Sequence, residues 1–120
     1  MAAGVYNFKV EQGVGYSFSV AYAEKNGQVI PLTGYTAIGK IKLKMSDTTP
    51  VAEFNCTVVP AEGKVNVELA HDALNGIVFK SNKFDDYVEA VYDLLITKDN
   101  SPSKRIRLLN GTIQISPKVT

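Results

Sequence analysis

Hydrophobic and polar residues alternate with a period of two along most of this chain. A β-strand makes this pattern when one of its faces lies in a core and the other faces water. The apolar positions of five such segments are Tyr16, Phe18, Val20 and Tyr22; Ile41, Leu43 and Met45; Phe54, Cys56 and Val58; Val65, Val67 and Leu69; and Val88, Ala90, Tyr92, Leu94 and Ile96. The sequence therefore predicts an all-β protein, and most other fold classes are excluded.

Short segments between these strands have the composition of turns. The pair Asn26-Gly27 favours a tight hairpin, with a short returning strand that Pro31 ends. In residues 70–79 the apolar spacing changes to that of one helical face, which predicts a single short helical turn. In the last strand the alternation slips in phase near residues 108–111, which predicts a β-bulge.

Seven or eight short strands separated by turns predict an antiparallel β-sandwich of immunoglobulin-like shape, with a small barrel as the alternative architecture. We expect residues 13–120 to form the sandwich domain. Residues 1–12 are expected to be an N-terminal arm or a first edge strand. The segment at residues 87–97 has apolar residues on both faces, so we expect it to lie in the centre of a sheet.

Charge and length exclude several classes of function. The chain has 120 residues, and 13 Lys and Arg against 12 Asp and Glu give a net charge of +1. A nucleic-acid binder needs a clear surplus of basic residues, so neither nucleic acid nor a membrane surface is an expected partner. No apolar run approaches the roughly 20 residues that cross a bilayer, and no secretory signal is visible, so synthesis in a cytoplasm is expected.

Residues with catalytic or metal-binding chemistry are few and scattered. His71 is the only histidine, and with the neighbouring Asp72 it has no convincing nucleophile, so we interpret His71 as a solvated or helix-start residue. Asp85 and Asp86 lack the spacing of a cation site and are interpreted as solvated carboxylates. Cys56 alternates with apolar residues and is expected to be an inert core residue. We therefore expect no enzyme activity and no cofactor.

Basic residues gather on one face of a predicted strand. Lys40, Lys42 and Lys44 alternate with apolar residues, so the three amines share the water-facing side. Such lysines commonly prevent edge-to-edge aggregation, which is one interpretation of this group. The other interpretation is a patch that docks an acidic surface of a partner.

Three segments carry a resemblance to a known family. Residues 30–37 read I-P-L-T-G-Y-T-A, residues 91–97 read V-Y-D-L-L-I-T, and residues 107–120 read R-L-L-N-G-T-I-Q-I-S-P-K-V-T. Together they resemble small virion proteins of tailed bacteriophages, in particular the N-terminal domain of phage baseplate upper proteins, over residues 13–120. We expect Leu32, Gly34, Gly111 and Pro117 in these segments to have structural roles: a core contact, a turn, a bulge and the end of pairing.

The resemblance implies a non-enzymatic structural protein of the virion, made in a bacterial host. Its partners would be tail, baseplate, fibre or capsid proteins, with multiple copies or a homo-oligomer in the particle. Capsid decoration is the alternative role, and a carbohydrate-binding module is a more distant one. Besides the three lysines, the candidate assembly contacts are Val5, Phe8 and Val10 in the N-terminal arm and Phe79 and Phe84 in residues 78–86. We expect removal of residues 1–9 to leave a folded monomer that no longer assembles.

Overall fold

The protein is built almost entirely from β-strands, as the sequence predicts. The computed structural model describes residues 4–22, 30–77 and 87–117. Its strands are β1 (Gly4–Val5), β2 (Phe8–Glu11), β3 (Tyr16–Ala21), β4 (Tyr35–Lys42), β5 (Ala52–Val59), β6 (Lys64–Leu69), β7 (Val88–Lys98) and β8 (Arg105–Ser116). Within these residues, two single 3-10 turns, at Pro60–Glu62 and Pro102–Lys104, connect β5 to β6 and β7 to β8.

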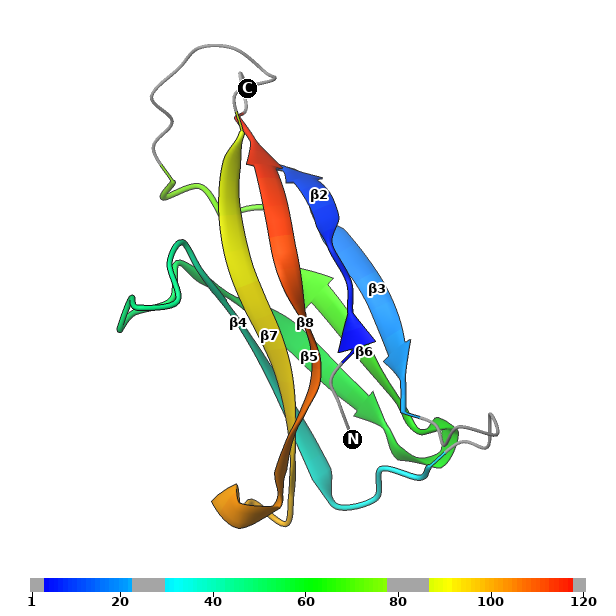
Figure 1. Ribbon diagram of the computed structural model, residues 1–120. Helices are drawn as coiled ribbons and strands as arrows, with labels where there is room; N and C mark the ends of the chain where they lie inside the picture. The colour runs from blue at the N-terminus through cyan, green and yellow to red at the C-terminus, as the bar shows by residue number, and fades with distance from the viewer. Residues whose placement is uncertain (1–3, 23–29, 78–86, 118–120) are drawn as a thin grey trace.

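The strands form one curled sheet in the order β1-β8-β7-β4-β5-β6-β3, with β2 also paired to β8. The curl occurs at β5, because its first residues pair with β4 and residues 55–59 pair with β6. The arm β4-β7-β8 therefore faces the arm β5-β6-β3 across the core (Figure 1). This arrangement is mixed and not purely antiparallel as expected, because β1 and β2 both run parallel to β8.

The core lies between the two arms and is made by the alternating residues that the sequence identifies. Val65, Val67 and Leu69 of β6 are at most 2% exposed, and Ile96 of β7 is fully buried. Strand β7 lies between β4 and β8, so its predicted central position is confirmed. Met45 differs from the prediction and is 83% exposed, because β4 ends at Lys42 before the alternation in the sequence does.

The phase slip in the last strand is a β-bulge, as predicted. Leu94 of β7 lies opposite Leu109, while the next residue, Leu95, lies opposite Arg107. Leu108 is therefore the extra residue in β8, and both it and Leu109 are buried. Gly111, the residue expected to permit the bulge, pairs in regular register instead. The bulge lets two consecutive leucines contribute to the core, which a regular strand does not allow.

Residues 70–77 do not form the helical turn that the sequence predicts. They form successive tight turns, in which the amide of Ile77 donates to the carbonyl of Leu74 at 3.2 Å. The buried side-chain amide of Gln12 donates to two backbone carbonyls of this segment, at 2.9 Å to that of Leu74 and at 3.1 Å to that of Ile77. These two bonds tie the turns to residue 12, and the side chains of Leu74 and Ile77 are both buried. Residues 78–79 lie outside the described part.

Two local predictions around β4 agree with the structure. Leu32 is fully buried, and Gly34 has a φ of +82°, a conformation that favours glycine. The predicted hairpin at Asn26-Gly27 lies outside the described residues. At its base the amide of Ile30 donates to the carbonyl of Tyr22 at 3.0 Å.

Candidate assembly surfaces

The N-terminal segment is held along β8 by an interrupted parallel ladder. β1 lies opposite residues 109–110 and β2 opposite residues 113–116, so the ladder breaks between them. At the break the amide of Thr112 donates to Oδ1 of Asn7 at 2.9 Å, and the amide of Tyr6 donates to the carbonyl of Asn110 at 3.0 Å. The side chain of Asn7 thus supplies the acceptor that the backbone ladder lacks there.

Phe8 and Val10 point into the protein's own core, which corrects their assignment as assembly contacts. They are 7% and 5% exposed, because β2 turns alternate side chains toward the opposite arm of the sheet. Of the three apolar residues proposed in this segment, only Val5 is exposed, at 71%. Residues 4–11 are therefore an edge segment of the sheet, and Phe8 and Val10 cannot contact a neighbouring molecule while β2 is in place.

An aromatic cluster joins β2 to β3 across the open side of the curl. The rings of Phe8 and Tyr16 are stacked with centroids 4.7 Å apart, and Phe8 also lies 5.3 Å from the ring of Tyr92. The hydroxyl groups of Tyr6 and Tyr16 share a hydrogen bond of 2.5 Å. Side chains, and not a backbone ladder, therefore connect these two strands.

Burial in this cluster raises the pKa of two tyrosine hydroxyl groups. It raises the pKa of Tyr16 to about 12, with a smaller contribution from the hydrogen bond to Tyr6. Burial also raises the pKa of Tyr92, whose hydroxyl donates to the carbonyl of Tyr6. Both groups therefore stay protonated over the ordinary pH range and act as structural hydrogen-bond partners.

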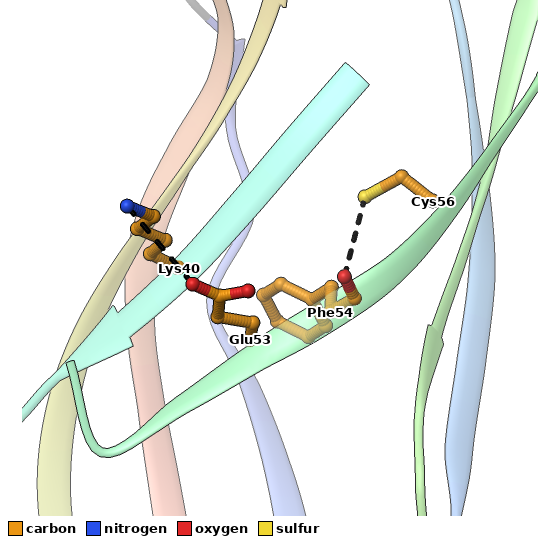
Figure 2. Close-up of polar contacts among 4 residues, drawn as sticks. All are labelled: Lys40, Glu53, Phe54 and Cys56. Carbon is orange, nitrogen blue, oxygen red and sulfur yellow. Dashed lines mark hydrogen bonds and ion pairs between the residues drawn. The ribbon is translucent and has the colours of Figure 1, made fainter. Parts of the chain in front are cut away.

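The outer face of the arm β4-β7-β8 carries two of the three lysines proposed as contacts. Lys40 lies 4.0 Å from a carboxylate oxygen of Glu53 on β5, and both side chains are about half exposed (Figure 2). Lys42 is half-buried on the same side of β4, while Lys44 follows the end of the strand and is exposed. The structure thus brings Lys40 and Lys42 together on one face, with Lys44 beyond it.

Apolar side chains lie beside these lysines, and they are not among the contacts expected from the sequence. Ile38 is 41% exposed and lies opposite Leu95, which is half-buried. Leu95 in turn lies opposite Arg107, whose Nε is 3.7 Å from a carboxylate oxygen of Asp93. We call this surface the β4-β7-β8 outer face. Its signal in the sequence was the apolar second face of residues 91–95.

Cys56 occupies the inner side of β5, close to the expected position. Its thiol is half-buried and lies 3.9 Å from the carbonyl of Phe54 (Figure 2). Burial raises the pKa of this thiol, and a backbone hydrogen bond from Gly39 opposes that shift. The thiol form is therefore favoured, which agrees with an inert core cysteine.

A cleft of about 490 Å³ lies where β2, β8 and the start of β3 meet. Tyr87 lines it and is 51% exposed. The polar residues of the lining are Lys9, Glu11, Tyr16, Gln114 and Ser116. An exposed ring beside amide, hydroxyl and carboxylate groups has the chemistry to contact a polar ligand with an apolar face.

The remaining candidate residues do not converge on a site. His71 is exposed in the turns after β6. Asp85, Asp86, Phe79 and Phe84 lie outside the described residues. Within residues 4–22, 30–77 and 87–117, no group of three or more His, Cys, Asp or Glu is placed to hold a metal ion. In the same residues, no helix is long and apolar enough to span a membrane.

Comparisons with known proteins give no family. No protein-family model matches the sequence, and no curated protein matches it. Among solved structures, an internalin-like protein of Listeria monocytogenes is similar, with 13% sequence identity and a TM-score of 0.38. The match covers 97% of this chain but only 28% of that protein, so this chain spans less than a third of its length. A likeness this weak carries no conclusion about function.

Proposed function

We propose that the protein is a non-enzymatic structural component of a tailed-bacteriophage virion, placed in the tail, the baseplate or a fibre attachment. It acts by binding other virion proteins and further copies of itself. The support from the sequence is the resemblance of residues 30–37, 91–97 and 107–120 to phage baseplate upper proteins. The support from the structure is the surface that the chain leaves uncovered.

The β4-β7-β8 outer face is the observation that carries the proposal. An exposed Ile38 and a half-buried Leu95 lie side by side there, among groups of both charges that include Lys40 and Asp93. An apolar centre within a charged surround is the usual anatomy of a protein–protein interface. The cleft of about 800 Å³ that Leu95 and Arg107 help to line is wide open and not enclosed. A protein partner therefore suits this broad face better than a small substrate.

The fold proposed for this component is an immunoglobulin-like sandwich. Its support is the strand order, in which β8-β7-β4 and β5-β6-β3 are two three-stranded groups facing each other. The ladder at β5 joins the two groups on one side. On the other side, aromatic side chains bridge β2 and β3.

Location in the particle tests the proposal. Peptide mass spectrometry should detect the protein in purified phage particles, and gold-labelled antibody should place it on the tail or baseplate in electron micrographs. A label on the head would favour capsid decoration instead. Absence of the protein from purified particles would overturn the virion role altogether.

A matched pair of variants tests the surface. Ile38→Lys should keep the fold, because Ile38 is 41% exposed, but should reduce incorporation into particles. Met45→Lys places the same charge on a residue that is 83% exposed and lies beyond the end of β4, and it should leave incorporation unchanged. Circular dichroism confirms that both variants fold. Equal incorporation of the two variants would exclude this face as the contact.

The cleft at Tyr87 supports a second candidate, a carbohydrate-binding module. Sugar rings stack on exposed aromatic side chains, and hydroxyl groups of the sugar would hydrogen-bond to Glu11, Gln114 and Ser116. A glycan array with wild type and Tyr87→Ala decides between the roles. Binding that Tyr87→Ala abolishes would favour the module, and no binding would remove it.

A further inference from the structure

Strand β3 is an edge of the curled sheet that has no strand partner on its outer side. It pairs with β6 through all six of its residues, and no other described strand forms a ladder with it. Strand β2 faces it only through side chains, by the stacked rings of Phe8 and Tyr16. The outer backbone groups of β3 are therefore available to a strand from another molecule.

The sequence of β3 lacks the features that normally protect an edge strand. It reads Y-S-F-S-V-A, with no charged residue, no proline and no bulge. Natural edges are usually blocked by charge, proline, bulges or very short length. The opposite edge of the sheet has such protection, because β2 carries Lys9 and Glu11 and the ladder is interrupted before it.

The hydrogen-bond phase of the β3–β6 ladder identifies which backbone groups face outward. The amide of Tyr22 donates to the carbonyl of Gly63 at 2.7 Å, in the same register as the rest of this ladder. Hydrogen-bonded pairs recur at every second residue of an antiparallel ladder, so Val20 and Phe18 also bond toward β6. The N–H and C=O groups of Ser17, Ser19 and Ala21 therefore point to the free edge.

We propose that β3 pairs antiparallel with β3 of a second copy of this chain, about a two-fold axis beside Ser19. The role of this pairing in a particle rests on the proposed function. The pairing adds to that function the contact through which two copies of the chain bind each other. Ser19 then lies opposite Ser19 of the partner subunit, and Ser17 lies opposite Ala21 of the partner subunit. All three outward-facing residues of each strand join the new ladder.

The side chains on the inner side of β3 favour a second copy of this chain as the partner. Tyr16, Phe18 and Val20 are only half-buried, whereas the residues of β6 beside them are at most 2% exposed. In the proposed register Phe18 lies opposite Val20 of the partner subunit, so each strand covers the partly exposed apolar residues of the other. The absence of charge in β3 matters here, because self-pairing about a two-fold axis sets like charges against each other.

A charge-swap experiment on the isolated chain tests the pairing. Sedimentation velocity of the wild type over a range of concentrations should show a dimer of twice 13.0 kDa. Ser19→Lys and Ser19→Glu should each raise the dimer dissociation constant about tenfold or more, because two like charges meet at the axis. A one-to-one mixture of the two variants should restore dimerisation.

Thr57→Lys is the matched control. Thr57 lies in the same row of the sheet as Ser19, with Asn66 between them, and its exposed side chain is two strands from the edge. Its dissociation constant should equal that of the wild type. Circular dichroism checks that every variant folds.

Several results would overturn the pairing. They are a wild type that stays monomeric up to about 1 mM, a Ser19→Lys variant that dimerises as well as Thr57→Lys, or a mixture that fails to restore the dimer. None of these depends on a phage particle. A monomer would therefore refute the pairing and leave the virion role open, whereas absence from particles would refute that role and leave a measured dimer standing.

Discussion

Gly111→Ala should push the connection between β1 and β2 away from β8. A Cβ atom at Gly111 would lie 2.1 Å from the carbonyl oxygen of Tyr6 and 2.8 Å from Oδ1 of Asn7. Real Cβ atoms do not approach other atoms this closely, and a backbone carbonyl cannot rotate away as a side chain can. The substitution therefore displaces the connection between β1 and β2, although alanine suits a β-strand better than glycine does.

The expected loss of stability follows from the hydrogen bonds that hold the connection between β1 and β2 in place. Tyr6 donates to Asn110, Asn7 accepts from Thr112, and the hydroxyl of Tyr92 donates to the carbonyl of Tyr6. Three bonds at about 1 kcal/mol each give a loss of about 3 kcal/mol in the free energy of unfolding. For a domain of this size, that loss lowers the melting temperature by about 10 °C.

Urea denaturation and thermal melting of the variant measure this loss. Gly76→Ala is the control, because a Cβ atom there meets no atom within 4 Å and Gly76 is exposed. That variant should be as stable as the wild type, or slightly more stable because the unfolded chain has less freedom. If Gly111→Ala melted together with Gly76→Ala, the contact between Tyr6 and Gly111 would not exist as described.

Four further predictions concern the aromatic core. Because burial raises the pKa of Tyr16 to about 12, above the unfolded value of 10.0, its stabilisation is complete below about pH 10 and is lost as the pH rises toward about 12. Urea midpoints at about pH 9 and about pH 11 should therefore differ less in Tyr16→Phe than in the wild type. Gly39→Ala brings a Cβ atom to 2.8 Å from the ring of Phe54, which can shift, so calorimetry should show a loss of about 1–2 kcal/mol, smaller than for Gly111→Ala. Phe8→Ala should cost about 3–5 kcal/mol. Deleting residues 1–9 should cost at least as much and not leave the stable monomer first expected, so a cooperative wild-type melt of the deletion would contradict the burial of Phe8.

Local alternation predicted the strands well because it reports directly which side chains face a core. It identified the inner residues of β3, β6 and β7, and the phase slip located the bulge at Leu108. It did not predict that β1 and β2 run parallel to β8, because the partner of a strand lies about 100 residues away in the sequence. It also placed Met45 inside, since alternation continues past Lys42, where pairing ends.

The candidate contacts were predicted less well, for a physical reason. Lys40 and Lys42 are on an outer face as expected, because a charged side chain on a strand rarely turns inward. Phe8 and Val10 were assigned outward, although their spacing follows the same rule that identified the other core residues. The apolar side chains of an alternating terminal segment can be buried against a neighbouring molecule or in the protein's own core. The sequence pattern is the same in both cases, and the fold distinguishes them.

The burial of Phe8 and Val10 also moves the expected connection between copies to another edge. A sheet of this kind has two edge strands, and the N-terminal one uses its apolar side chains on the interior while presenting Lys9 and Glu11 outward. Strand β3 differs in each respect, because it is uncharged, its inner residues are only half-buried, and Ser17, Ser19 and Ala21 face outward without a partner strand in the described part of the chain. If copies of the chain join edge to edge, β3 therefore forms the contact, and the charged side chains of β2 disfavour pairing at the opposite edge.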